Sequence, residues 1–300
     1  MSTISTTLQP FDLANEAGYQ TWRAAKLADY PAAADLVVRI NNAAALTDQE
    51  HAAILERCRK TNLAIYEVTG EGKTDKPVIR AFGRQFGLVT LDMNLRADED
   101  SITSLRVVEA SAGTHYIPYT NRPLNWHTDG YYNRLDEQVR GIVMHCVSAS
   151  ASGGENLFLD PEIAYLLLRD EDPKYIEAFM QPDAMTIPPN IEAGVELRPA
   201  QSGPVFSVMH ASGALHMRYT ARTRSIAWKD NAITRRAAGF LAELLASDSV
   251  YIVRHRLSAG QGIICNNVLH KREAFSDDAG SRQERLLYRA RYHERIRGTY

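Results

Sequence analysis

The sequence has few cysteines and no long hydrophobic run. Its 300 residues contain 3 cysteines, at positions 58, 146 and 265, and none of them forms a Cys-x-x-Cys pair. Scattered cysteines argue against a disulfide framework and against a thiolate zinc site, and they are typical of a protein from a reducing compartment. No apolar stretch reaches the length of about 18 residues that a transmembrane helix needs.

An excess of charge of either sign is missing as well. The formal net charge is -2 and no run of Lys and Arg occurs, so no electrostatic footprint for nucleic acid or for a membrane surface is present. The first 16 residues lack the basic and the apolar segments of a secretory signal. We therefore expect a cytoplasmic protein without a nucleic-acid or membrane partner, and leave self-association into a homo-oligomer open.

The sequence does contain an ordinary supply of core residues, arranged in short segments. Hydrophobic residues make up 45% of the chain and charged residues 23%, as in a folded soluble protein. Helices are predicted at 47–60, where Thr47 and Glu50 form a capping box, at 76–87, after Asp160-Pro161, and at 234–247. Strands are predicted at 63–68, 104–109, 138–150, 156–160, 250–257, 262–267 and 285–293.

The order of these segments indicates the fold class. Many short strands follow a helical N-terminal third, which favours a mainly β protein with flanking helices (α+β). We expect a β-sandwich or jelly-roll core with helices packed on one sheet. No internal repeat or low-complexity linker marks a boundary, so residues 1–300 are predicted to form a single domain.

The stretch "NWHTDGYYN", residues 125–133, carries the first candidate site residues. His127 and Asp129 are two positions apart, so on a strand their side chains would point to the same side. One histidine and one carboxylate are too few for a metal site, and a third ligand must come from elsewhere. Two histidines and one carboxylate form the ligand set of non-haem Fe(II) oxygenases.

Among the remaining histidines, His270 is the strongest candidate for the third ligand. It follows the apolar segment "GIICNN", and we expect it at the end of a strand. His210 and His216 rank second, because their surroundings are rich in Ala, Ser and Gly and no strand is expected to lead into either. The full set of candidates is His115, His145, His210, His216, His255, His270 and His293.

The segment "RQERLLYRARYH" places two arginines on one face of a predicted strand. Arg285 and Arg289 would share that face with Leu287. A buried guanidinium needs an anionic partner, and its planar fork suits a carboxylate. The alternative is a solvated edge strand on which these arginines pair with Glu284 or Glu294.

Four motifs together resemble the taurine dioxygenase family of Fe(II)- and 2-oxoglutarate-dependent oxygenases: "WHTDG", "GGENLFLD", "NNVLHKREAF" and "RLLYRARY". The resemblance runs from about residue 63 to residue 292. It implies a double-stranded β-helix (jelly roll) core in 104–300, a supporting segment 1–103 and an insert at 160–248.

The resemblance also implies roles for particular residues. His127, Asp129 and His270 would bind Fe(II), and no catalytic residue is expected beyond these ligands. Arg285 would bind the distal carboxylate of the co-substrate 2-oxoglutarate. Asn156 occupies the position that is usually Thr in the family and would help to hold the co-substrate. The expected reaction consumes O2, releases succinate and CO2, and hydroxylates a small molecule; desaturation, ring closure and epimerisation stay open on the same site.

The substrate is less well specified by the sequence. The resemblance implies that Arg289 lies close enough to meet either co-substrate or substrate, and its charge favours a small acid such as an amino acid, another carboxylate or a sulfonate. Trp126, Tyr131 and Asn121 are candidate substrate contacts, although aromatic residues such as Trp126, Tyr131 and Tyr132 are equally typical of a core.

Two functions other than that of an oxygenase are compatible with the same candidate residues. A jelly-roll metalloprotein can hold Zn(II) or Mn(II) and act as an isomerase or hydrolase without 2-oxoglutarate. A catalytically silent, metal-dependent sensor is the other alternative. The Arg285 strand favours the oxygenase, because its charge suits a dicarboxylate co-substrate.

Overall fold

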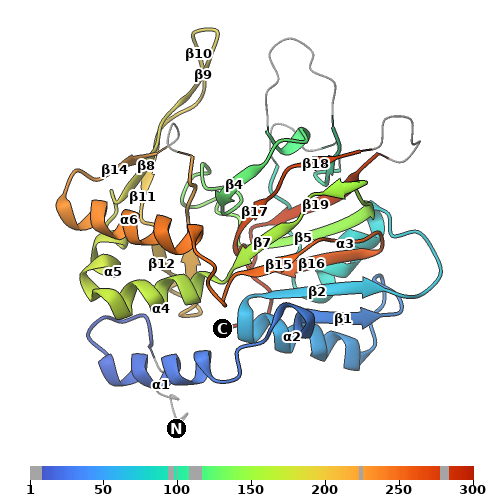
Figure 1. The fold of residues 1–300 in the computed structure, drawn as a ribbon, viewed down its shortest axis with the longest axis horizontal. Helices are drawn as coiled ribbons and strands as arrows, with labels where there is room; N and C mark the ends of the chain where they lie inside the picture. The colour runs from blue at the N-terminus through green and yellow to red at the C-terminus, as the bar shows by residue number, and fades with distance from the viewer. Residues whose placement is uncertain (1–8, 94–97, 99, 108–116, 223–225, 278–283) are drawn as a thin grey trace.

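The fold contains two main sheets, of which the larger has six strands. The computed structural model describes residues 9–93, 98, 100–107, 117–222, 226–277 and 284–300. Six strands form this sheet, in the order β1-β2-β16-β5-β19-β3 (Figure 1). Their bounds are β1 Val37–Ile40, β2 Leu63–Val68, β16 Gln261–Cys265, β5 Gly141–Ser148, β19 Leu286–Tyr292 and β3 Thr103–Leu105. Only β1 and β2 pair in parallel; the other neighbours are antiparallel.

Helices α2 (Asp48–Thr61) and α3 (Lys76–Gln85) cover one face of this sheet. Thr47 and Glu50 form the predicted capping box, which satisfies backbone N–H groups at the start of α2. Ile54 from α2 and Phe82 from α3 pack into one core with Val143 of β5 and Tyr292 of β19. The central strands β5 and β16 are buried over most of their length because both of their faces are covered.

The second sheet faces the other side of the larger one. It has four strands in the order β15-β7-β17-β4, with bounds β15 Val253–His255, β7 Asn156–Leu159, β17 Leu269–Arg272 and β4 Leu124–His127. Alternation along β7 divides its side chains between two cores. Phe158 packs between the sheets with Met144 of β5 and Leu287 of β19, whereas Leu157 and Leu159 point outward.

A helical lobe covers the outward face of the four-stranded sheet (Figure 1). Its helices are α1 (Glu16–Leu27), α4 (Pro161–Glu171), α5 (Pro173–Phe179) and α6 (Ala232–Ala246). Helices therefore lie on the outer faces of both sheets, and the expectation that they pack on one sheet is wrong. The expected mixed α+β class is confirmed by the several sheets and the flanking helices.

Shorter elements complete the lobe and the connections. Two short 3-10 helices are η1 (Ala33–Leu36) and η2 (Ile117–Tyr119). The remaining strands are β6 Ser152–Gly153, β8 Met185–Ile187, β9 Asn190–Glu192, β10 Val195–Arg198, β11 Gln201–Gly203, β12 Phe206–Val208, β13 Leu215–Met217, β14 Ala227–Trp228 and β18 Phe275–Ser276. None of the helices within the described residues is both long and apolar enough to cross a membrane.

Most predicted elements are present, and one difference concerns a site residue. Four predicted helices are observed as α2, α3, α4 and α6, while α1 and α5 were not predicted. His270 lies inside β17, paired on both sides, and not at a strand end. The turn at Asn266 and Asn267, with Asn267 at φ 49, ends β16 and lets the new strand begin.

Candidate active site

Two histidines and an aspartate meet between the sheets. His127 of β4 and His270 of β17 are paired across the smaller sheet, and their rings lie 4.2 Å apart. Their strand neighbours Trp126 and Leu269 point into the outer core, so alternation turns both imidazoles inward. Asp129 follows β4, and the three candidate ligand atoms lie within 4.8 Å of one another. Within the described residues this is the one group of three potential metal-ligating side chains.

Backbone carbonyls fix the tautomer of both histidines. Nδ1 of His127 lies 2.8 Å from the carbonyl of Asn125, and Nδ1 of His270 lies 2.9 Å from that of Val268. A carbonyl oxygen can only accept, so each Nδ1 carries the proton and donates. Each Nε2 then presents its lone pair, which is the form in which histidine binds a metal.

Asp129 is held by its backbone and by one carboxylate oxygen. Its N–H donates to Oδ1 of Asn267 at 2.8 Å, and Nδ2 of Asn267 donates back to the Asp129 carbonyl at 2.9 Å. Nη1 of Arg289 donates to Oδ1 of Asp129 at 3.1 Å. The other oxygen, Oδ2, is buried and has no hydrogen-bond partner among the described residues. A bound cation would satisfy this oxygen, so the donor set fits a metal ion.

The electrostatics of the site set these groups in their metal-binding protonation states. Burial alone would raise the pKa of Asp129, but the positive charges of Arg289 and Arg291 outweigh it and hold that pKa well below its usual value. Burial, together with the neighbouring His270, lowers the pKa of His127 to about 3. Burial likewise lowers the pKa of His270. At neutral pH the site therefore offers one carboxylate and two neutral imidazoles.

Arg285 is a buried cation without an acceptor. Its side chain is only 5% exposed, and its guanidinium donates no hydrogen bond and forms no ion pair within the part of the chain described. Burial lowers its pKa, and the nearby Cys146 and Asp277 offset part of this effect. A carboxylate ligand is the group that this guanidinium lacks.

The alternative in which the arginines line a solvated edge strand does not hold. Strand β19 lies between β5 and β3, and Arg285 and Arg289 are both buried. Glu294 accepts hydrogen bonds from the backbone N–H groups of Val89 and Thr90.

Asn156 begins β7 opposite Arg272, is buried, and donates to the carbonyl of Gly154 at 3.4 Å.

The three candidate substrate contacts lie in three different environments in the structure. Trp126 is 4% exposed, and its indole donates to the carbonyl of Leu245 at 2.9 Å, so this side chain belongs to the outer core and does not face the metal ligands. The half-buried ring of Tyr131 lies 6.5 Å from the ring of His127. Asn121 is exposed, and its carbonyl accepts from the N–H of Phe275 at 3.1 Å.

The other histidines lie outside the group of three. His210 is exposed in a turn, whereas His216 is buried in β13; the expectation that no strand leads into this region is wrong, because β12 and β13 form a hairpin around it. His145 contacts Tyr66, and His255 contacts Gln261. His293 bonds a backbone carbonyl. His115 lies outside the described residues.

Several residues that the sequence did not single out support the site. Asn267 holds Asp129, and Arg291 adds positive charge from a buried pair with Asp92. Arg272 and Phe275 lie beside Arg285. The position of Arg272, two residues after His270 on the same strand, was the available signal; the role of Asn267 depends on tertiary contacts that no local pattern shows.

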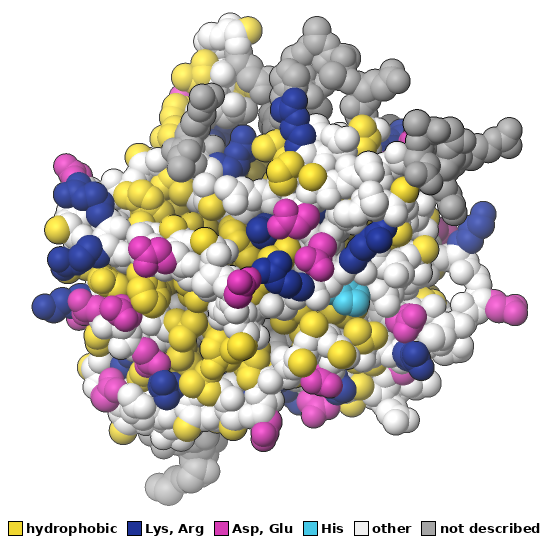
Figure 2. All heavy atoms as spheres, in the orientation of Figure 1, with side chains coloured by type: hydrophobic (Ala, Val, Ile, Leu, Met, Phe, Trp, Pro, Cys, Tyr) yellow, Lys and Arg dark blue, Asp and Glu magenta, His cyan; other side chains and the backbone are white. Residues whose placement is uncertain are grey.

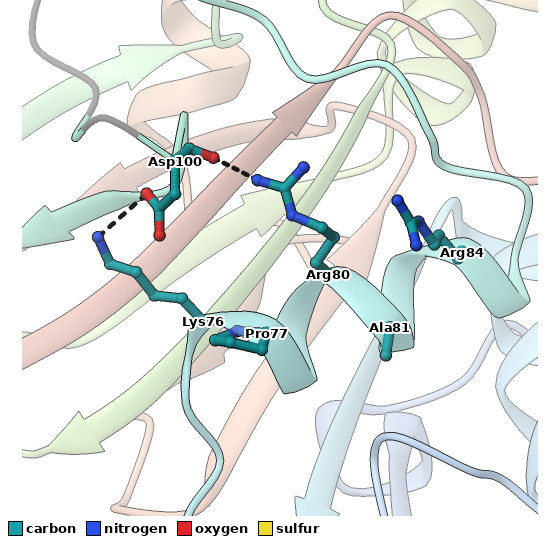
Figure 3. A pocket seen from close by; sticks show the side chains of 6 residues that line it. All are labelled: Lys76, Pro77, Arg80, Ala81, Arg84 and Asp100. Atoms are coloured by element: carbon teal, nitrogen blue, oxygen red, sulfur yellow. Dashed lines mark hydrogen bonds and ion pairs between the residues drawn. The ribbon is translucent and has the colours of Figure 1, made fainter.

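A surface pocket on α3 is distinct from this centre (Figure 3). Lys76, Arg80 and Arg84 line it along one side of the helix, and the first two reach toward Asp100. Lys76 pairs with the carboxylate of Asp100, whereas Arg80 donates to its backbone carbonyl. Among the described residues, this pocket contains no group of three potential metal-ligating side chains. On the face drawn in Figure 2, Lys and Arg side chains are interspersed with Asp and Glu, and no basic patch forms.

Comparison with known proteins identifies the family. The sequence profile described as "Taurine catabolism dioxygenase TauD, TfdA family" matches residues 32–291. The chain belongs to this family. Members of the TauD/TfdA family are Fe(II)- and 2-oxoglutarate-dependent dioxygenases, so the expected enzyme class and both cofactors are confirmed.

Two curated relatives are similar to this chain in sequence, and a solved structure shares its fold. A uridine-5'-phosphate dioxygenase from Amycolatopsis sp is 32% identical over 184 residues, which cover 58% of this chain and 62% of that protein. A second uridine-5'-phosphate dioxygenase, from Streptomyces sp, is 27% identical over 210 residues, which cover 65% of this chain and 71% of the Streptomyces protein. The crystal structure of a taurine dioxygenase from Burkholderia xenovorans shares the fold, with a TM-score of 0.57, 18% identity and 87% of each chain covered.

Proposed function

We propose that this enzyme holds Fe(II) through His127, Asp129 and His270, and that it oxidises a small anionic molecule at a C–H bond. The observation that carries the proposal is the buried Asp129 carboxylate beside two imidazoles whose Nε2 atoms are free to bind: its Oδ1 lies 3.8 Å from Nε2 of His127, and its Oδ2 has no hydrogen-bond partner among the described residues. Three protein ligands leave open coordination positions for co-substrate and dioxygen. When bound, Fe(II) and 2-oxoglutarate supply the oxidation of the substrate by O2, with release of succinate and CO2.

The chain's own residues supply binding and orientation. Arg285 binds the distal carboxylate of 2-oxoglutarate, since its buried guanidinium has no acceptor in the described part of the protein. Asn156 lies on the strand between those that carry His255 and Arg272, and its amide assists in holding the co-substrate. Arg289 orients Asp129 and places a positive charge beside the metal position.

We further propose that residues 1–300 form one catalytic domain with a double-stranded β-helix core. The site lies between two facing sheets, with His127 and His270 from the smaller sheet and Arg289 from the larger. Segment 160–248, the proposed insert, contains α4, α5, α6 and the small sheets β9-β10, β8-β11-β14 and β12-β13. Segment 1–103 supports the core and also contributes β1 and β2 to the larger sheet.

The proposed substrate carries an anionic group. The positive charges of Arg289 and Arg291 border the site, and Tyr131 provides an aromatic surface next to His127. Two relatives are named for uridine-5'-phosphate, so a nucleoside 5'-monophosphate is the first substrate to test. Amino acids, other carboxylates and sulfonates follow as further small anions.

Succinate release tests this function. The protein is supplied with Fe(II), 2-oxoglutarate and air, and succinate is measured with uridine-5'-phosphate, a panel of small acids, and uridine as the matched uncharged control. We expect one anion to stimulate succinate formation well above the substrate-free rate, with uridine much weaker. Stimulation by uridine equal to that by its phosphate would contradict the anionic preference.

A further inference from the structure

Phe275 lies beside two buried guanidinium groups. Cζ of Arg285 is 4.6 Å from the centre of the Phe275 ring, and Cζ of Arg272 is 4.9 Å from it. Both distances are within the range of a cation–π interaction, which gains strength where water is excluded. Arg272, Phe275 and Arg285 are each less than a tenth exposed.

The two arginines differ in what else they contact. Nη2 of Arg272 donates to the carbonyls of Thr120 at 2.8 Å and Arg122 at 2.5 Å, so this side chain is fixed to the loop before β4. The guanidinium of Arg285 has no such bond within the described ranges. The neighbouring carboxylate of Asp277 accepts from the backbone N–H of Arg285 at 3.4 Å, and not from its guanidinium.

The Phe275 ring is itself held from two sides. Its backbone N–H donates to the carbonyl of Asn121, and β18 pairs with β6, placing Phe275 opposite Gly153. Gly153 has φ 67, and a Cβ there would lie 2.3 Å from the carbonyl oxygen of Ala274, so the close approach of this turn requires glycine. A Cβ on Gly154 would lie 3.4 Å from Cβ of Phe275 and 3.8 Å from Nε of Arg285.

We propose that Phe275 is a positioning residue for the co-substrate: its ring holds the guanidinium of Arg285 in place without neutralising it. A carboxylate in that position would also hold Arg285, but it would occupy the donors and the charge that the ligand needs. An aromatic face attracts the cation and leaves its N–H groups free. This inference rests on the proposed function, in which Arg285 binds the distal carboxylate of 2-oxoglutarate.

The test compares Phe275→Leu with Phe275→Tyr, which keeps the ring. The dissociation constants of Fe(II) and 2-oxoglutarate are measured anaerobically, and KM and kcat are measured with the best substrate. For Phe275→Leu we expect the 2-oxoglutarate constant and KM to rise about 3- to 30-fold, as loss of a cation–π contact predicts. Fe(II) affinity and kcat at saturating 2-oxoglutarate should stay within about twofold, and Phe275→Tyr should restore 2-oxoglutarate binding.

Two controls separate positioning from packing. Phe82→Leu removes a fully buried ring from the core beside α3 and should lower thermal stability without changing the 2-oxoglutarate constant. If Phe275→Leu fails to fold, Phe275→Met fills the volume without a ring and carries the same expectation. An unchanged 2-oxoglutarate constant in a folded Phe275→Leu or Phe275→Met variant would overturn the inference.

A double variant shows whether Phe275 acts through Arg285. In an Arg285→Ala background, Phe275→Leu should weaken 2-oxoglutarate binding no further. The same fold-change in both backgrounds would overturn the positioning role while leaving the proposed function intact. An Arg285→Ala variant that binds 2-oxoglutarate normally would instead overturn the assignment of Arg285 in the proposed function, and this inference with it.

Discussion

Arg289 donates a hydrogen bond to one oxygen of Asp129, and the second oxygen of this carboxylate is buried without a partner among the described residues. The bond to Oδ1 fixes the orientation of the carboxylate, and the unpaired Oδ2 still has lone pairs that can bind a cation. The pairing with Arg289 also keeps the carboxylate charged in a place where burial would favour the neutral acid. A metal ligand with a fixed direction and a permanent charge is the result.

Removing the positive charge of Arg289 should make metal binding more sensitive to acid. This charge lowers the pKa of Asp129, His127 and His270, so Arg289→Leu raises the pKa of all three. Protons then compete with the metal at higher pH. We expect the acid limb of Fe(II) binding to move to higher pH, and affinity at neutral pH to fall about 10- to 100-fold.

Anaerobic calorimetric titration with Fe(II) across a pH series measures this shift. Arg236→Leu removes an exposed arginine from α6 and serves as the matched control. An acid limb that is the same in Arg289→Leu and in the control would refute the role given to Arg289.

The choice of the third ligand is tested by three histidine variants. His270→Ala should abolish stoichiometric Fe(II) binding, because only two ligands remain. His216→Ala and His210→Ala should retain it, since both residues lie outside the group of three. Metal content after anaerobic loading and desalting distinguishes these outcomes, and loss of metal from His216→Ala would show that the ligand set is misassigned.

Arg285→Ala should separate co-substrate binding from metal binding. The guanidinium is buried beside Phe275 and has no contact with the three metal ligands in the described structure. We expect the dissociation constant of 2-oxoglutarate to rise at least about 30-fold, as for loss of a buried charged pair. The Fe(II) constant, measured in the same titration series, should stay within about threefold; a joint loss of both would point to local unfolding.

His216 should make stability depend on pH. Burial, reinforced by Arg140, Arg295 and Arg218, lowers its pKa to about 3. The unfolded imidazole takes up a proton below its ordinary value of 6.5, while the folded one stays neutral until about 3. The free energy of unfolding therefore falls as pH decreases through this window, by up to about 1.4 kcal/mol per pH unit.

Urea unfolding at several pH values between these limits measures the effect. His216→Gln should reduce the slope of the free energy of unfolding against pH by up to about 1.4 kcal/mol per pH unit, which is the contribution of one proton. His210→Gln changes an exposed residue and should leave this slope as it is. Equal slopes in the wild type and His216→Gln would show that His216 is protonated in the folded protein over this range.

The local part of the site could be predicted from the sequence, and the tertiary part could not. Strand alternation predicted that His127 and Asp129 point to the same side, and the structure brings them together with His270, although Asp129 lies in the turn just after β4. The same alternation turns Trp126 away, but choosing which residue faces inward requires knowing that both faces of β4 are covered. That knowledge comes from α6, more than 100 residues later in the chain.

The supporting residues depend on contacts that the sequence does not encode locally. Asn267 reaches Asp129 because a turn with a left-handed residue brings β17 back beside β4. The Phe275 ring meets Arg285, ten residues later in the chain, through a tertiary contact that no local pattern predicts. The expectation of helices on one sheet failed because only tertiary contacts decide that α2 and α3 cover the larger sheet while α4 and α6 cover the smaller one.

The central claim is that His127, Asp129 and His270 hold an iron to which 2-oxoglutarate binds. It is tested most directly by anaerobic titration of the metal-free protein with Fe(II) and then 2-oxoglutarate, recorded by visible absorption. We predict a weak charge-transfer band that requires both additions and is absent from His127→Ala. Iron that binds without producing the band on addition of 2-oxoglutarate, or a band that persists in His127→Ala, would contradict the account.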